Sequence, residues 1–140
     1  MNSTVVADNL TQVREQISRI ARRTGRDPNS IRLIAVSKTK SLQLVEAAFR
    51  AGQCDFGENT IQDALQKIPA LNSPLLQWHF LGHLQSNKVK YIPVHFNWVH
   101  SLDSLALAKR LSEQAEKNSV KINCLLQINI DRDPAKYGLL

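Results

Sequence analysis

The sequence of 140 residues lacks the long features that would assign it to a membrane or export class. Its uninterrupted apolar runs reach only four or five residues, whereas a membrane-spanning helix needs about 20. The first ten residues hold no basic segment followed by an apolar core, so a secretory signal is not expected. We therefore expect a cytoplasmic protein with no membrane partner.

Cysteine is also scarce, with only Cys54 and Cys124. They lie far apart in apolar surroundings, which favours buried reduced thiols over a disulfide or a metal site. Hydrophobic residues make up 43% and charged residues 21% of the chain, close to the average for a globular protein. Length and composition predict one folded domain over residues 1–140.

The charge is positive but has no concentrated patch. The chain carries 18 Lys and Arg against 12 Asp and Glu, a net charge of +6, and its longest basic run in the N-terminal helix region is Arg22-Arg23. Such an excess suits an anionic partner. A nucleic-acid-binding module would show a basic and aromatic platform, which the sequence does not offer. Because the positive charge is dispersed along the chain, a solvated surface is the simpler interpretation.

Apolar and polar residues alternate in a rhythm of strands and helices. An amphipathic helix is expected from Asp8, as N-cap, to Gly25. Strands are expected over residues 31–36, 54–56, 76–81, 96–99 and 122–130, with helices over 42–51, 59–68, 86–91 and 102–117. Strands separated by helices at this spacing predict parallel β/α units. Two architectures fit, a doubly wound sheet or a (β/α)-barrel, and no Gly-x-Gly-x-x-Gly supports the dinucleotide-binding version.

Polar side chains follow the predicted strands at their carboxyl ends, which share one face in a parallel α/β fold. They include Ser37-Lys38-Thr39-Lys40, Gly57-Glu58-Asn59, Gly82-His83, His100-Ser101 and Asn129. This distribution favours the barrel and an active site at that face.

Lys38 is the most informative of these residues. At the end of a strand buried on both faces, its amine would lose water, and a neutral amine can attack an aldehyde to form an imine. The competing interpretation, which spacing alone favours, is a lysine that extends to solvent. Glu58 and Asn59 could cap or complement the dipole of the following helix, or Asn59 could face a ligand.

The four histidines invite a metal interpretation that the spacing does not favour. His79 and His83 straddle a strand end and a glycine, and no acid or cysteine completes a ligand set. Structural or hydrogen-bonding roles are preferred for His79, His83, His95 and His100. The run His100-Ser101-x-Asp103 contains the residue types of a Ser-His-Asp catalytic triad, but the resemblance is superficial. Ser101 or Asp103 is better explained as a helix cap.

Five ordered motifs together resemble a known family. They are Ala35-Val36-Ser37-Lys38-Thr39, Phe56-Gly57-Glu58-Asn59, the segment from Trp78 to Lys88, His100-Ser101-Leu102-Asp103, and Leu126-Gln127-Ile128-Asn129-Ile130. In this order and spacing, they are similar to the pyridoxal phosphate homeostasis proteins, the YggS family, from about Asn9 to the last residue.

The resemblance implies an α/β fold of the (β/α)8-barrel family, like the N-terminal domain of alanine racemase. Residues 1–140 would supply an N-terminal helix and the first five β/α units, a single incomplete barrel domain. It also implies that Lys38 holds pyridoxal 5'-phosphate (PLP) as a Schiff base, with Asn59 beside the cofactor ring. The implied function is intracellular cofactor homeostasis without catalytic turnover, with PLP-accepting apoenzymes as possible partners. Lys40 and Lys136 resemble lysines that the family keeps near the site.

The sequence departs from the family in two ways. Thr60 stands where the family usually has Tyr, and a full barrel takes roughly 200 residues or more, so the phosphate-binding residues near the last strands are not in this sequence. Five strands leave two unpaired edges, which predicts instability or self-association of the isolated chain. The missing phosphate-binding residues predict weaker cofactor binding. The alternative function is a PLP-dependent racemase-like enzyme, which needs an acid or base on each side of the substrate. Tyr137 is the nearest candidate for the second group.

Overall fold

A computed structural model describes residues 2–140 and contains one five-stranded parallel sheet. Its strands are β1 (Ala35–Val36), β2 (Asp55–Glu58), β3 (Gln77–Phe80), β4 (Trp98–Leu102) and β5 (Asn123–Leu126). They lie in chain order, β1-β2-β3-β4-β5, with no reversal. A doubly wound sheet reverses its order at a switch point, so the order confirms the barrel-type arrangement.

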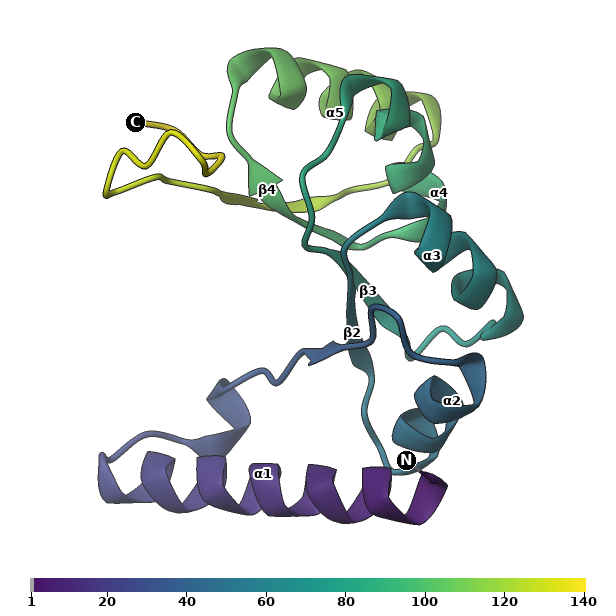
Figure 1. The fold of residues 1–140 in the computed structure, drawn as a ribbon, viewed down its shortest axis with the longest axis vertical. Coiled ribbons are helices and arrows are strands. Elements are labelled where there is room, and N and C mark those ends of the chain that lie inside the picture. Colours follow the sequence, from purple (N-terminus) through teal and green to yellow (C-terminus); the bar gives the residue numbers. More distant parts are fainter. Residues whose placement is uncertain (1) are drawn as a thin grey trace.

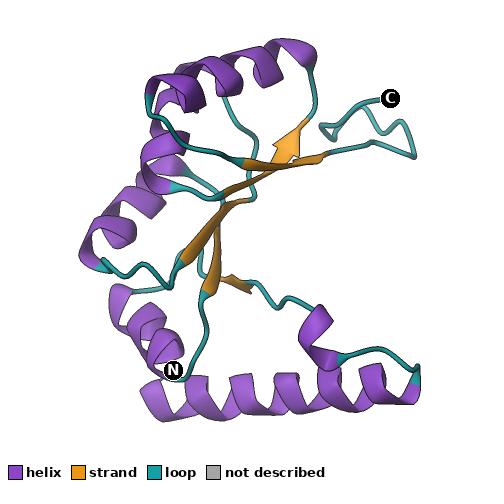
Figure 2. Ribbon diagram, turned by 180° about the vertical axis from the view of Figure 1, so that it is seen from behind, coloured by secondary structure: helices purple, strands orange, loops and turns teal. Residues whose placement is uncertain are grey.

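The sheet is curved, and its helices α2, α3, α4 and α5 lie along the convex side (Figures 1 and 2). They are α2 (Leu42–Arg50), α3 (Ile61–Lys67), α4 (Ile92–His95) and α5 (Leu105–Lys117), with 3-10 turns at Pro28–Ser30, Ile68–Ala70 and Ser86–Tyr91. Helix α1 (Ser3–Arg23) packs against α2 and crosses the end of the structure beside β1 (Figure 1). This is the layout of a barrel wall with its outer helices.

The hydrophobic core lies between the sheet and the outer helices. Alternate residues of the central strands point outward into it, including Phe56, Trp78, Phe80 and Val99, which are all at least 95% buried. Leu107 and Leu111 of α5 pack into the same core. Because side chains alternate along a strand, the intervening residues Gly57, His79 and Trp98 belong to the concave inner face.

The last strand contrasts with this core. All four residues of β5 are exposed, among them Leu125 and Leu126, and residues 127–140 continue beyond the sheet (Figure 1). The strand pairs with β4 through a register shift between Val99 and Leu102. Apolar side chains at this edge therefore remain in contact with water.

Several predicted boundaries and local roles were wrong. Helix α1 begins at Ser3 with Asn2 as its cap, so Asp8 lies inside the helix. Helix α5 is capped by Ser104, whose hydroxyl accepts from the Leu107 N–H, and Ser101 lies in β4. Burial of Cys124 is also wrong, since it is exposed, while Cys54 is half-buried and both are free thiols.

Among residues 2–140, no helix combines the length and the apolar character that crossing a membrane would require.

Candidate functional site

Lys38 lies in a tight turn directly after β1. The Lys40 N–H donates to the Ser37 carbonyl at 3.0 Å, and Thr39 has a φ of 60°, a positive value typical of the third residue of a type II turn. The β1–β2 register pairs Val36 with Gly57. Lys38 and Asn59 each lie two residues after this pair, so both follow the paired ends of β1 and β2 at the carboxyl rim of the sheet.

The surroundings of Lys38 differ from the expectation. Ser37 is buried, whereas Val36, Lys38, Thr39 and Lys40 are exposed, so the turn itself lies at the surface. The predicted burial of the Lys38 amine is wrong, because Lys38 lies in an exposed turn after β1 and not within the buried part of the strand. The predicted position at the carboxyl rim is retained.

Asn59 follows β2 directly and is half-buried. It lines a groove with Thr60, Gln62, Phe80, His83 and Lys88. Gly82 lies against it so closely that a Cβ at Gly82 would stand 1.9 Å from the Asn59 carbonyl oxygen. Only glycine allows this approach, which fixes the Asn59 backbone against the loop after β3.

Glu58 does not cap a helix, contrary to that interpretation. It is the last residue of β2 and fully buried, while Thr60 caps α3 by accepting from the Asp63 N–H at 3.2 Å. Glu58 belongs instead to a buried polar group under the outer helices, formed by Ser37, Glu58, Asp63 and Lys67, which we name the Lys67 cluster.

In the Lys67 cluster, the Lys67 Nζ donates to Glu58 Oε1 at 2.9 Å and to Asp63 Oδ2 at 3.0 Å. The Ser37 hydroxyl donates to Glu58 Oε1 at 2.6 Å, and Glu58 Oε2 has no hydrogen-bond partner among the described residues. Burial raises the pKa of Glu58, although the bonds from Ser37 and Lys67 oppose it. Burial also acts to raise the pKa of Asp63, but bonds from the Thr39 N–H and Lys67 outweigh it and lower that pKa.

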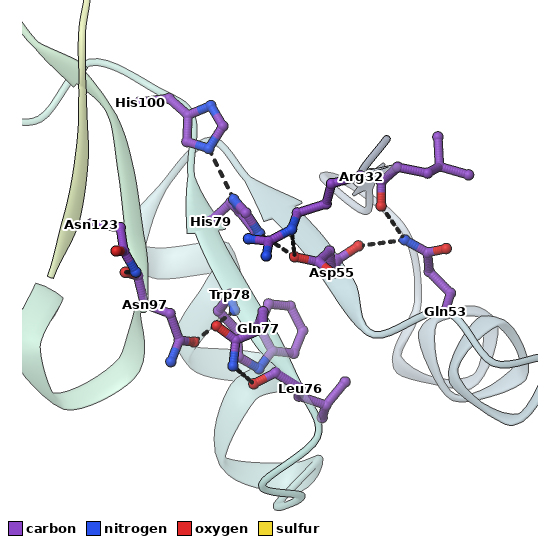
Figure 3. A network of polar contacts seen from close by, with 11 residues as sticks. Arg32, Gln53, Asp55, Leu76, Gln77, Trp78, His79, Asn97, His100 and Asn123 are labelled. Atoms are coloured by element: carbon purple, nitrogen blue, oxygen red, sulfur yellow. Dashed lines mark hydrogen bonds and ion pairs between the residues drawn. The ribbon is translucent and has the colours of Figure 1, made fainter. Parts of the chain in front are cut away.

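A second polar network crosses the concave face (Figure 3). His79 Nε2 lies 2.8 Å from Asp55 Oδ2, and His79 Nδ1 lies 2.9 Å from His100 Nε2. A carboxylate only accepts hydrogen bonds, so His79 donates from Nε2 and accepts at Nδ1 from His100. Arg32 lies 3.7 Å from Asp55 and 5.1 Å from the centre of the Trp98 ring.

These contacts give His79 and His100 the hydrogen-bonding role preferred from the sequence. Burial lowers the pKa of His79 despite the opposing effect of Asp55, and burial together with the neighbouring His79 lowers the pKa of His100. Within residues 2–140, no group of three or more His, Cys, Asp or Glu residues is placed to hold a metal ion.

The other candidate residues are spread around the rim. Tyr137 stacks on His83, with ring centres 3.7 Å apart and planes 9° from parallel, so the C-terminal segment reaches the groove beside Asn59. Lys40 lines a separate groove with Val6, Leu10 and Leu44. Lys136 is exposed and lies 3.7 Å from Asp133.

The fold and the rim together describe part of a parallel (β/α)-barrel with a lysine after its first strand. A family model for the N-terminal domain of alanine racemase matches residues 9–139. The chain therefore belongs to the family of alanine racemase N-terminal domains.

Within this family, the chain is similar to proteins named pyridoxal phosphate homeostasis protein. It is 44% identical over 137 residues to the one from Escherichia coli (strain K12), covering 96% of this chain and 58% of the relative. It is 45% identical over 133 residues to the one from Pseudomonas aeruginosa, covering 95% and 58%. The chain thus spans 58% of the length of these relatives.

Solved structures agree in fold. The structure of PipY from Synechococcus elongatus with PLP bound matches with a TM-score of 0.75 and 40% identity, covering 89% of this chain and 57% of that one. A protein from Bifidobacterium adolescentis matches with a TM-score of 0.88 and 26% identity, covering 99% and 60%.

Proposed function

We propose that this chain binds PLP through a Schiff base on Lys38 and serves intracellular cofactor homeostasis as a carrier. The observation that carries the proposal is an accessible primary amine on a constrained turn at the carboxyl rim, where Asn59 also lies. Its similarity to homeostasis proteins and to a PLP-bound structure supports the choice of ligand. PLP supplies an aldehyde, which a neutral lysine amine attacks to form a C=N bond while water leaves.

The residues present fit the aldehyde end of this ligand. Lys38 is exposed at the carboxyl rim, where an aldehyde can reach its amine. Asn59 is half-buried at the same rim and offers an amide that can donate and accept hydrogen bonds to a ring substituent. Its backbone is held by the close approach of Gly82, so its side chain starts from a fixed point.

The phosphate group of PLP has fewer candidate binding residues in this chain than the aldehyde has. Barrel phosphate sites commonly form near the last two strands, and this chain spans 58% of the length of its relatives. Lys88 lines the groove beside Asn59 and carries a positive charge. We therefore expect PLP to bind this chain more weakly than a closed barrel would bind it, with Lys38 supplying the main attachment.

A carrier needs reversible capture. Lys38 in an open site allows water or a second amine to reach the attachment point, so exchange can return the aldehyde to solution or to a PLP-accepting apoenzyme. Lys38 must lose its proton before attack and regains one on release. No further group is required for this cycle, which is why carriage is proposed in preference to catalysis.

Titration with PLP tests the proposal. We expect the 140-residue chain to develop the absorbance band of a PLP Schiff base, and Lys38→Ala to lose it. Lys117→Ala, an exposed lysine at the end of α5, is the matched control and should keep the band. An equal band in Lys38→Ala would contradict the assignment.

One observation favours a second candidate, a racemase-like enzyme. The stack on His83 brings Tyr137 to the groove that Asn59 lines, and a tyrosine is a possible second acid or base. Exchange of the α-proton of amino acids into deuterated water, measured with PLP present, would support this candidate. If PLP is bound and no α-proton exchange occurs, the racemase-like candidate is excluded and the carrier function is retained.

We also propose that the open sheet edge makes the isolated chain self-associate. Leu125, Leu126 and Ile128 are exposed along β5 and its continuation, and an exposed strand edge is a template for pairing. Sedimentation should show species larger than 15.8 kDa. A monomer with a sharp cooperative thermal transition would contradict this expectation.

A further inference from the structure

The Lys67 cluster holds a deeply buried ion pair that the proposed function does not use. The Lys67 side chain is 4% exposed and that of Glu58 is 0% exposed. A charge buried this deeply is retained only when its bonds compensate for lost water. Its contacts therefore indicate what the cluster does.

Lys67 reaches from the last turn of α3 to the end of β1. Besides Glu58 and Asp63, its Nζ donates to the Ser37 carbonyl at 2.8 Å. An ammonium has three N–H donors, so these three bonds use all of them. Lys67 is thus a fully bonded cation and has no free amine with which to compete for an aldehyde.

The bonds of the cluster fall on both sides of Lys38. Lys67 holds the Ser37 carbonyl, and Asp63 Oδ2, which Lys67 also contacts, accepts from the Thr39 N–H at 2.9 Å. The same ammonium holds Glu58, the residue before Asn59. One buried side chain therefore anchors the immediate neighbours of both proposed cofactor residues.

The turn itself needs such an anchor. Thr39 has a φ of 60°, in the left-handed region that β-branched residues rarely adopt. Strained backbone of this kind persists only where its surroundings over-determine it. The bonds to Ser37 and Thr39 supply that constraint, and without them Thr39 can return to a negative φ and redirect Lys38.

We propose that Lys67 is a positioning residue: through Ser37, Glu58 and Asp63 it holds the turn that places Lys38 at the carboxyl rim, beside the strand end that Asn59 follows. The proposal rests on the proposed function for its consequence, the capture of PLP by Lys38. The hold on the turn is a property of the ligand-free chain and is measured separately.

The test replaces Lys67 by Met, which keeps the length and removes the donors. Glu58→Gln is made in the same chain so that no buried carboxylate is left without its cation. Lys117→Met is the control for loss of a lysine. Two quantities are measured in variants whose circular dichroism is unchanged: hydrogen exchange of the Thr39 amide without ligand, and the PLP concentration that half-saturates Lys38.

We expect exchange of the Thr39 amide to be about tenfold faster in Lys67→Met/Glu58→Gln, and half-saturation to need about tenfold more PLP, since a tenfold change corresponds to one lost hydrogen bond of ordinary strength. The control should match the original chain in both. A folded variant with unchanged exchange, or with faster exchange and unchanged half-saturation, would overturn the proposal.

A second pair of variants applies if the first does not fold. Asp63 is 28% exposed, so water can replace its side chain and Asp63→Ala should still fold. Asp63→Ala removes the acceptor of the Thr39 N–H, whereas Asp63→Asn keeps an acceptor oxygen. Asp63→Ala should show faster Thr39 exchange and weaker PLP binding, and Asp63→Asn should restore both toward the original. Equal behaviour of the two would overturn the proposal.

If the original chain fails to attach PLP at Lys38, the proposed function fails, while the exchange measurement still decides whether the cluster holds the turn.

Discussion

The two polar networks of this chain lie on opposite faces of the same sheet and differ in what surrounds them. The Lys67 cluster is enclosed between the sheet and α3, with Glu58 and Lys67 almost completely removed from solvent. The network on the concave face is partly open, with Arg32 53% and Asp55 17% exposed. The enclosed network contacts backbone at the rim, whereas the open one joins side chains across three strands.

This difference separates two kinds of polar group in one barrel wall. Bonds to the Ser37 carbonyl and the Thr39 N–H constrain the main chain, so the outer cluster acts on where Lys38 is held. Bonds between His79, Asp55 and His100 satisfy side chains that would otherwise face the concave interior without partners. The first network constrains the backbone of the turn, and the second provides hydrogen-bond partners for buried side chains.

The largest stability effect is expected at the enclosed network. Lys67→Ala leaves the buried Glu58 without its cation, and breaking a buried pair in this way costs about 3–5 kcal/mol. Urea unfolding measures the change in the free energy of unfolding. A loss below about 1 kcal/mol would be no larger than the contribution of a surface ion pair. It would contradict the distinction between the two networks.

A smaller effect is expected on the concave face. Asp55→Ala leaves the buried His79 Nε2–H without its acceptor, at a cost of about 1–3 kcal/mol. Asp131→Ala, at an exposed aspartate beyond β5, is the control and should stay within about 0.5 kcal/mol of the original chain. A loss at Asp55 as large as that at Lys67 would mean that partial exposure does not weaken the network.

The smallest effect concerns pH, and the two networks contribute with opposite signs. The lowered pKa values of His79 and His100 mean that the unfolded chain binds protons first, so their contribution is present above about pH 6.5 and is lost as pH falls through the folded values. The raised pKa of Glu58 means that its contribution is present below about pH 4.5 and is lost as pH rises through the folded value.

Unfolding in urea at several pH values between about 7.5 and 5 tests this. We expect the free energy of unfolding to fall on acidification across this range, and the double variant His79→Gln/His100→Gln to show a shallower fall. A slope that is unchanged by both substitutions would assign the pH dependence to other groups.

Much of the fold could be predicted from the sequence, because β/α units repeat and their strands carry apolar β-branched runs. The rim position of Lys38 followed from its place after the first such run. Boundaries were harder: residues 31–34 have strand-like composition, yet only Ala35–Val36 pair as β1. At an unpaired edge, composition alone does not decide where ladder bonds form.

The two networks were not recognised from the sequence. The signal for the outer cluster was local, since Asp63 and Lys67 are four residues apart on one helix face, but the same spacing is common on solvated helices. The inner network had a longer signal: Asp55, His79 and His100 are 24 and 21 residues apart, close to the strand repeat. Only tertiary pairing brings such residues together.

Reductive trapping tests the central claim most directly. The chain is incubated with PLP, reduced with borohydride, digested, and the modified peptide is identified by mass spectrometry. The account predicts a single principal adduct on Lys38, with the buried Lys67 unmodified. Adducts spread over the exposed lysines, in proportion to their accessibility and without preference for Lys38, would contradict it.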